Sequence, residues 1–121
     1  NNAPTGSYFA VLKHRNSLET WSAAPMLLNA AGNYSYNFTT SASQSFGSNT
    51  ILKSGVYCNY SGDVNQDGFI NLTDIINIYN DAGIFVTGYK VTDVNGDSIS
   101  DLTDVIIANN NSNNFVSRIR P

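Results

Sequence analysis

A twelve-residue acidic pattern occurs twice in the chain, 30 residues apart. DVNQDGFINLTD begins at Asp63, and DVNGDSISDLTD begins at Asp93. Both copies have Asp at positions 1, 5 and 12 and Asn at position 3, and apolar residues follow both. A spaced motif that recurs at a fixed offset indicates a structural repeat. The C-terminal half is therefore expected to contain two copies of one supersecondary unit.

The duplicated segment holds most of the acidic residues. Eight of the nine lie between Asp63 and Asp104, where Lys90 is the only basic residue, so the segment has a formal charge of −7 against −3 for the whole chain. Carboxylates held close together in a loop repel one another, at a cost on the order of a few kcal/mol for each close pair. The pattern therefore predicts bound cations.

The oxygen-bearing residues have the spacing of a calcium-binding loop. Such a loop supplies about six to eight oxygen ligands, from side chains at positions 1, 3 and 5, a carbonyl at 7, a group at 9 and a carboxylate at 12. The sequence predicts two calcium ions. The expected ligands of the first are Asp63, Asn65, Asp67, the carbonyl of Phe69, Asn71 and Asp74. Those of the second are Asp93, Asn95, Asp97, the carbonyl of Ile99, Asp101 and Asp104.

Both copies depart from the standard loop. Position 12 is Asp rather than Glu, so the helix must approach the metal more closely. Position 6 is Gly68 in the first copy and Ser98 in the second, at a turn that favours a residue tolerating positive φ. The second loop is therefore expected to be the more strained.

A helical pattern follows each loop. Apolar residues recur at intervals of three and four, which predicts one buried helix face, and the NNNSNN tract is expected to end the second helix. The apolar stripe consists of Leu72, Ile75, Ile76 and Tyr79 in the first copy and of Leu102, Val105 and Ile106 in the second.

The helix starts are marked by capping residues. Asn71 and Asp101 are expected at the two N-caps, with Asp74 and Asp104 three residues later. Side-chain oxygens at these positions accept the unpaired N–H groups of the first turn, and the helix dipole favours carboxylates there. Each unit is therefore expected to be a loop followed by one helix.

The N-terminal half has the pattern of short β-strands. Residues 33–40, NYSYNFTT, place Tyr34, Tyr36 and Phe38 on one face and polar residues on the other. Further strands are expected in SYFAVLKH, ETWSA, PMLL, TILK and GVYCNY. The predicted fold is α+β, with an antiparallel partial sandwich over 1–61 packed with tandem calcium loop–helix units over 62–121.

The duplicated loops resemble those of dockerin modules. GDVNQDGFINLTD and TDVNGDSISDLTD each precede a short helix, and the text upstream of each is strand-like, as in the F-hand repeats of that family. The likeness covers residues 62 to about 117. The text from GSYFAVLKH to GVYCNYSG is also similar to a β-rich region that precedes such repeats at the C-termini of some large secreted bacterial proteins.

This resemblance implies a non-catalytic role. In dockerins, helices held by calcium dock onto a cohesin partner and anchor the host protein in an extracellular assembly. The positions that usually read the partner fall on Leu72-Thr73 and Leu102-Thr103. Leucine there departs from the common small hydroxyl pair.

Other functional classes lack their sequence signals. The chain has no nucleophile elbow, phosphate loop or zinc spacing, so no catalytic residue is predicted, and its acidic centre opposes nucleic-acid binding. Its apolar runs are too short for membrane insertion. His14, beside two basic residues, is expected to be solvated, and Cys58 has no second cysteine to pair with.

Three non-catalytic functions remain open for a chain whose uncharged polar composition is typical of secreted or cell-surface proteins. The first is a self-associating filament or surface subunit that exchanges strands between copies. The second is a docking module for a cohesin-like receptor, and the third is glycan adhesion through Tyr34, Tyr36 and Trp21. Attached glycans are also expected, at positions drawn from Asn33, Asn37, Asn59, Asn110 and the DSI motif at Ser98.

Overall fold

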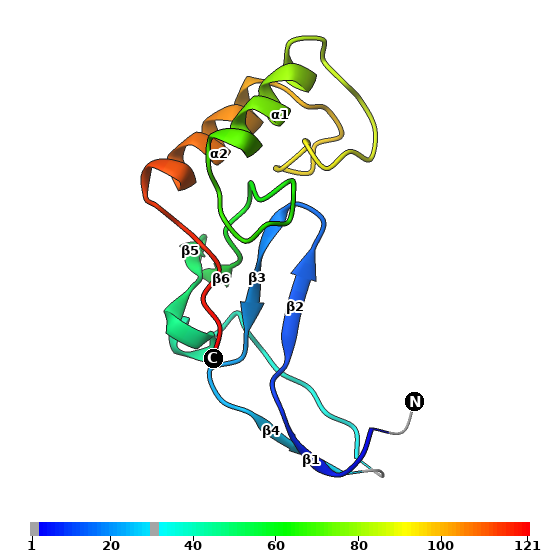
Figure 1. Ribbon diagram of the computed structural model, residues 1–121, viewed down its shortest axis with the longest axis vertical. Coiled ribbons are helices and arrows are strands. Elements are labelled where there is room, and N and C mark those ends of the chain that lie inside the picture. Colours follow the sequence, from blue (N-terminus) through cyan, green and yellow to red (C-terminus); the bar gives the residue numbers. More distant parts are fainter. Residues whose placement is uncertain (1–2, 30–31) are drawn as a thin grey trace. The chain divides into compact units, whose positions relative to one another are not determined.

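The computed structural model describes residues 3–29 and 32–121 (Figure 1). This part of the chain is a small α+β fold, which confirms the predicted class. Its elements are β1 (Gly6–Tyr8), β2 (Val11–His14), β3 (Ser17–Trp21), β4 (Met26–Leu28), the 3-10 turns η1 (Ala42–Gln44) and η2 (Phe46–Ser48), β5 (Ile51–Lys53), β6 (Val56–Cys58), α1 (Leu72–Ala82) and α2 (Leu102–Asn113). No helix among these residues is long and apolar enough to cross a membrane.

The chain divides into two compact units. The first comprises the described residues of Asn1–Leu12, Thr20–Cys58 and Ile119–Pro121. The second comprises Lys13–Glu19 and Asn59–Arg118. The turn between β2 and β3 therefore belongs with the duplicated C-terminal segment, an association across the chain that the predicted boundary at residue 61 did not include.

The strands form three separate two-stranded sheets, β1 with β4, β2 with β3, and β5 with β6. The β5–β6 hairpin is closed by Ser54 and Gly55, which have positive φ angles of 49° and 84° while Lys53 faces Val56. A two-residue turn with this backbone matches the twist of paired strands. The pairing of β5 with β6 therefore follows from the two turn residues between them.

The strand expected over residues 33–40 is wrong, because that segment has no strand pairing. Its aromatic residues make other contacts. The Tyr36 hydroxyl donates to the Gln44 carbonyl at 2.6 Å, and the Tyr36 and Phe38 ring centroids lie 4.8 Å apart. These contacts hold the segment in place, together with one backbone bond to β6 in which Tyr57 N donates to Thr39 O at 3.0 Å.

Both helices begin at the positions that the capping pattern in the sequence predicts. Asn71 and Asp101 are the N-caps, and each forms a capping box with the Asp three residues later. The second helix ends inside the NNNSNN tract, as predicted, although it continues through most of the tract to Asn113, with Asn114 as its C-cap. Buried Asn111 explains the extension, since its amide donates to the Ser61 carbonyl at 2.7 Å.

The core of the second unit is small and lies between the loops and the helices. It contains Val64, Ile78, Val94 and Ala108, against which Ile75, Val105 and Ile107 pack. The expectation that the whole apolar stripe is buried is wrong, because Leu72, Ile76 and Tyr79 of α1 and Leu102 and Ile106 of α2 are exposed. Asp74 and Asp104 are buried instead and turn these stripes away from the core.

Each loop pairs with the segment that follows the other helix. Ile70 N donates to Val116 O at 3.2 Å, and its repeat equivalent Ser100 N donates to Val86 O at 2.8 Å. α1 and α2 lie side by side in the same unit (Figure 1). The two copies therefore exchange equivalent contacts, so each one helps to shape the loop of the other.

Candidate metal centres in two loops

The carboxylate at position 12 organises the backbone of the first loop. Asp74 is fully buried. Its Oδ1 accepts from Val64 N at 2.9 Å and Asn65 N at 3.3 Å, and its Oδ2 accepts from Asn71 N at 3.0 Å. Asp74 therefore joins the start of the loop to the start of α1.

The second loop is built in the same way. Buried Asp104 accepts from Val94 N at 2.8 Å and Asn95 N at 3.1 Å through Oδ1. Its Oδ2 accepts from Asp101 N at 2.8 Å. The duplicated sequence thus produces a duplicated hydrogen-bond pattern around the position-12 carboxylate.

Positions 3 and 5 form tight local turns. Asn65 Oδ1 accepts from Asp67 N at 2.9 Å, Asp67 Oδ1 accepts from Phe69 N at 2.9 Å, and the Asn65 amide donates to Asp67 Oδ2 at 3.0 Å. The second loop repeats these bonds with Asn95, Asp97 and Ile99. At position 9, the Asn71 and Asp101 oxygens cap their helices by accepting from Thr73 N and Thr103 N.

Asp63, at position 1 of the first loop, has a buried oxygen without a donor. The residue is 2 % exposed. Its Oδ2 accepts from Gly68 N at 3.2 Å, whereas Oδ1 finds no hydrogen-bond partner among the described residues. A buried polar atom left unsatisfied is costly and rare in proteins. This oxygen marks where the first loop lacks a positive partner.

The pKa of Asp63 also reflects its burial and the absence of a cationic partner among the described residues. The pKa of Asp63 is raised from 3.8 to about 6, first by burial and also by the negative charges of Asp74 and Asp67, against the lowering effect of the Gly68 N–H. A nearby cation would reverse the electrostatic part of this shift. The hard oxygen donors of the loop fit calcium.

The structure does not bring all the predicted side-chain ligands together. In the part of the chain that the structure describes, no three His, Cys, Asp or Glu side chains converge in a metal-binding group. Asp63 and Asp74 lie close enough to interact electrostatically, while Asp67 and Asp97 hydrogen-bond to neighbouring Asn side chains. Calcium binding would require positions 3 and 5 to turn from each other toward the ion.

Asp93, at position 1 of the second loop, differs from Asp63. Its Oδ1 accepts from Gly96 N at 2.7 Å, its Oδ2 accepts from Ser98 N at 3.0 Å, and Arg15 Nη2 lies 3.6 Å from Oδ2. Sequence reasoning missed Arg15, which lies 78 residues from Asp93 along the chain. No local spacing signals a contact of this length.

Backbone strain is shared between the loops. Ser98 has a φ of 75°, as its place in the motif predicted, but the first loop has a non-glycine residue, Gln66, at φ 60°. In the other copy of the repeat each of these positions is a glycine. Gly68, at φ 92°, corresponds to Ser98, and Gly96, at φ 83°, corresponds to Gln66. Each loop therefore contains one left-handed glycine and one left-handed residue with a side chain, so the strain is not confined to the second loop.

The other candidate residues lie outside the loops or at their surface. His14 Nδ1 lies 3.0 Å from Asn16 Oδ1, and Cys58 is a half-buried free thiol. Asn59 is half-buried as well. The remaining expected glycan positions, Asn33, Asn37, Asn110 and Ser98, are exposed.

The raised pKa of Asp63 makes the calcium-free protein sensitive to pH. The folded state keeps the proton of this carboxyl up to about pH 6, whereas the unfolded chain loses it near 3.8. The unfolding free energy should therefore fall as pH rises from about 4 to about 6. Urea unfolding in chelator across this range checks the effect, with Asp63→Asn as the reference. Equal pH dependence in both proteins would contradict it.

Comparison of the chain with protein-family models, curated proteins and solved structures found no match.

Proposed function

We propose that the protein is a non-catalytic, calcium-stabilised extracellular assembly module, with a dockerin-like pair of loop–helix units in its C-terminal half. One observation carries the proposal, the buried Asp63 Oδ1 that has no donor among the described residues. It lies at position 1 of a loop whose sequence spacing matches calcium ligation. A divalent cation would supply the missing positive partner.

The residues that would hold calcium are those of the two loops. In the first loop these are the side chains at positions 1, 3, 5, 9 and 12 and the Phe69 carbonyl, and the second loop repeats this set. The ion would neutralise the loop carboxylates and tie the start of each loop to its helix. Binding energy of this kind becomes folding energy when the loop is not preformed in the unfolded chain.

The exposed apolar stripe supports assembly with another protein. Leu72 and Leu102 are each 66 % exposed, and Ile76 and Ile106 repeat the exposure one turn later. Residues at this spacing lie on one face of a helix. We propose that these two exposed stripes, Leu72 and Ile76 of α1 and Leu102 and Ile106 of α2, together named the helix face, contact a second copy of the chain. Strand exchange at the unpaired sheet edges extends the assembly.

A separate cohesin-like receptor is the second candidate partner. The same helix face favours it, because Leu72 and Leu102 occupy the positions that the dockerin resemblance assigns to partner recognition. Glycan adhesion has less support, because the Tyr36 hydroxyl is bonded to the Gln44 carbonyl and the Trp21 and Phe9 rings pack with their centroids 6.0 Å apart.

Sedimentation of the purified chain at micromolar concentration tests the proposal. Wild-type protein should self-associate in calcium, and Leu72→Ser/Leu102→Ser should be at least tenfold weaker with an unchanged thermal midpoint. Leu27→Ser is the comparison variant, because Leu27 is 69 % exposed on β4, outside the helix face, and reports on the strand edge instead.

Three outcomes locate the contact. Loss of association in the helix variant alone supports the helix face. Loss in Leu27→Ser alone places the contact at the strand edge. A monomer under all these conditions contradicts self-assembly and favours the receptor.

A further inference from the structure

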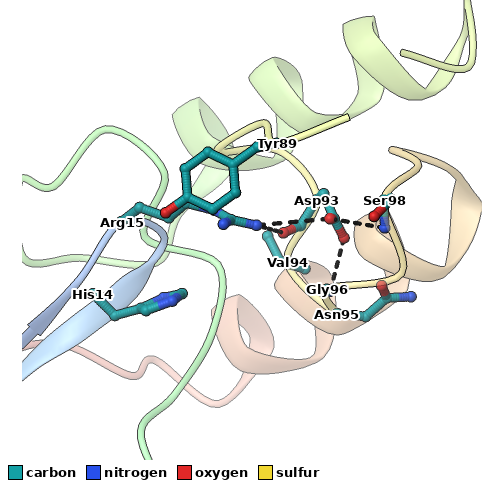
Figure 2. A pocket seen from close by; sticks show the side chains of 8 residues that line it. All are labelled: His14, Arg15, Tyr89, Asp93, Val94, Asn95, Gly96 and Ser98. Carbon is teal, nitrogen blue, oxygen red and sulfur yellow. Dashed lines mark hydrogen bonds and ion pairs between the residues drawn. The ribbon is translucent and has the colours of Figure 1, made fainter. Parts of the chain in front are cut away.

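Arg15 links the turn between β2 and β3 to the second loop. Its Nη2 lies 3.6 Å from Asp93 Oδ2 and donates to the Asp93 carbonyl at 3.4 Å. Figure 2 shows the guanidinium directed at the Asp93 carboxylate, which also accepts from the backbone of Gly96 and Ser98. A positive group is thus already present at position 1 of this loop.

The guanidinium is held by more than its charge. Its carbon lies 3.8 Å from the centroid of the Tyr89 ring, and the Arg15 side chain is 18 % exposed. The neighbouring Asn16 amide donates to the Val91 carbonyl at 3.0 Å and to the Asp93 carbonyl at 2.7 Å. The turn is therefore fixed to the chain that leads into the second loop, and stacking on Tyr89 orients the charge (Figure 2).

The first loop has a guanidinium nearby, that of Arg118, which lies against Gly68, but this group makes no ion pair with the position-1 carboxylate. Asp63 forms no ion pair with any described residue, and its Oδ1 lacks a donor. Asp93, at the same position of the repeat, has hydrogen bonds or an ion pair at both oxygens. Two loops of nearly the same sequence thus differ in whether the position-1 carboxylate already has a cationic partner.

We propose that Arg15 is an internal counter-ion of the second loop and makes the two loops fill in order. Calcium enters the first loop at lower concentration. It enters the second loop only when it displaces the guanidinium from Asp93. This inference rests on the proposed calcium binding and adds to it the regulation of the second loop.

The surroundings allow this displacement. A cavity of about 400 Å³ lies beside the ion pair, and its lining includes His14, Arg15, Tyr89, Asp93 and Ser98. Tyr89 is exposed, so the stacked pair can move without opening the core. Because like charges repel at short range, the guanidinium should weaken calcium binding at this loop by roughly threefold to tenfold.

A calcium titration followed by NMR resolves the two loops in the intact chain. The Gly68 amide donates to Asp63 and reports the first loop, and the Gly96 amide donates to Asp93 and reports the second. In wild-type protein the Gly68 signal should move at lower calcium than the Gly96 signal. The Arg15 side-chain signal should move with Gly96.

Three variants separate the charge of Arg15 from other effects. Arg15→Gln should lower the calcium concentration at the Gly96 midpoint by roughly threefold to tenfold and leave the Gly68 midpoint unchanged. Arg15→Lys should stay near wild type. Lys90→Gln is the control, because Lys90 is exposed and forms no ion pair with any described residue, so removing its charge should change the Gly96 midpoint less than twofold.

The outcomes distinguish this inference from the proposed function. Equal Gly96 midpoints in wild type and Arg15→Gln, with both loops responding, would overturn the role of Arg15 alone. An Arg15 signal that does not move in wild type while Gly96 does would also overturn it, whether or not the variant folds. If neither the Gly68 nor the Gly96 amide signal moves on calcium addition, both the proposed calcium binding and this inference are overturned.

Discussion

Removing calcium should lower the thermal midpoint of the second unit by about 10–20 °C for each occupied loop. One ion present at a hundred times its dissociation constant adds about 2.7 kcal/mol to the folded state. For a unit of this size, each kcal/mol corresponds to about 4–8 °C. The effect should be large because the core of the unit is small. Its buried apolar residues are the cluster of Val64, Ile78, Val94 and Ala108, together with Leu18 and Ile70.

Circular dichroism and calorimetry with and without chelator measure this shift. Hydrogen exchange locates it, because the amides of Val64 and Asn71, which donate to Asp74, should lose protection first. Amides of the β5–β6 hairpin in the first unit are the internal reference. The same midpoint and the same protection in chelator would contradict a stabilising role for calcium.

Asp74→Ala should unfold most of the second unit, even with calcium present. The substitution leaves three backbone N–H groups without their acceptor, those of Val64, Asn65 and Asn71. Each unsatisfied buried donor costs about 1–3 kcal/mol. The total should exceed about 3 kcal/mol, which is a large part of the stability of a small domain.

Two further variants show whether charge or hydrogen bonding is responsible. Asp74→Asn keeps one acceptor oxygen and should be less destabilising than Asp74→Ala, although it too should lose calcium binding. Asp81→Asn removes the same charge from α1 but keeps an acceptor for the Thr92 hydroxyl. Chemical denaturation in chelator should rank Asp81→Asn nearest to wild type. An Asp74→Ala protein as stable as Asp81→Asn would contradict the organising role of Asp74.

The loops and helix starts could be predicted because their determinants are local. Asn71 and Asp74 are three residues apart and form one capping box, and Asp101 and Asp104 repeat it. Such contacts depend on spacing alone, so a sequence motif specifies them. The same reasoning anticipated the positive φ of Ser98.

The buried helix face could not be predicted from the apolar pattern. Asp74 must face the loop to accept the N–H groups of Val64 and Asn65, and this fixes the rotation of α1. Ile78, one turn further, is then buried, while Leu72 and Ile76 point outward. Hydrogen bonding by a carboxylate thus overrode the hydrophobic periodicity.

Contacts between residues far apart in the chain could not be predicted for a different reason. The Arg15–Asp93 pair joins two segments 78 residues apart, and neither carries a motif for the other. Residues 33–40 illustrate the converse. Their alternating pattern predicts a strand, but they form no ladder and are held by ring and hydroxyl contacts and by a single backbone bond from Tyr57 to Thr39. Long-range pairing decides both cases.

Titration calorimetry of the metal-stripped protein with calcium, beside Asp63→Asn, tests the central claim most directly. Wild type should bind calcium in two steps, and Asp63→Asn should lose the tighter step while keeping the weaker one. The substitution preserves the shape of the side chain and removes the negative charge of the carboxylate. One oxygen of that carboxylate, Oδ1, has no donor among the described residues. Absence of calcium binding by the wild type, or identical binding by the two proteins, would contradict the account.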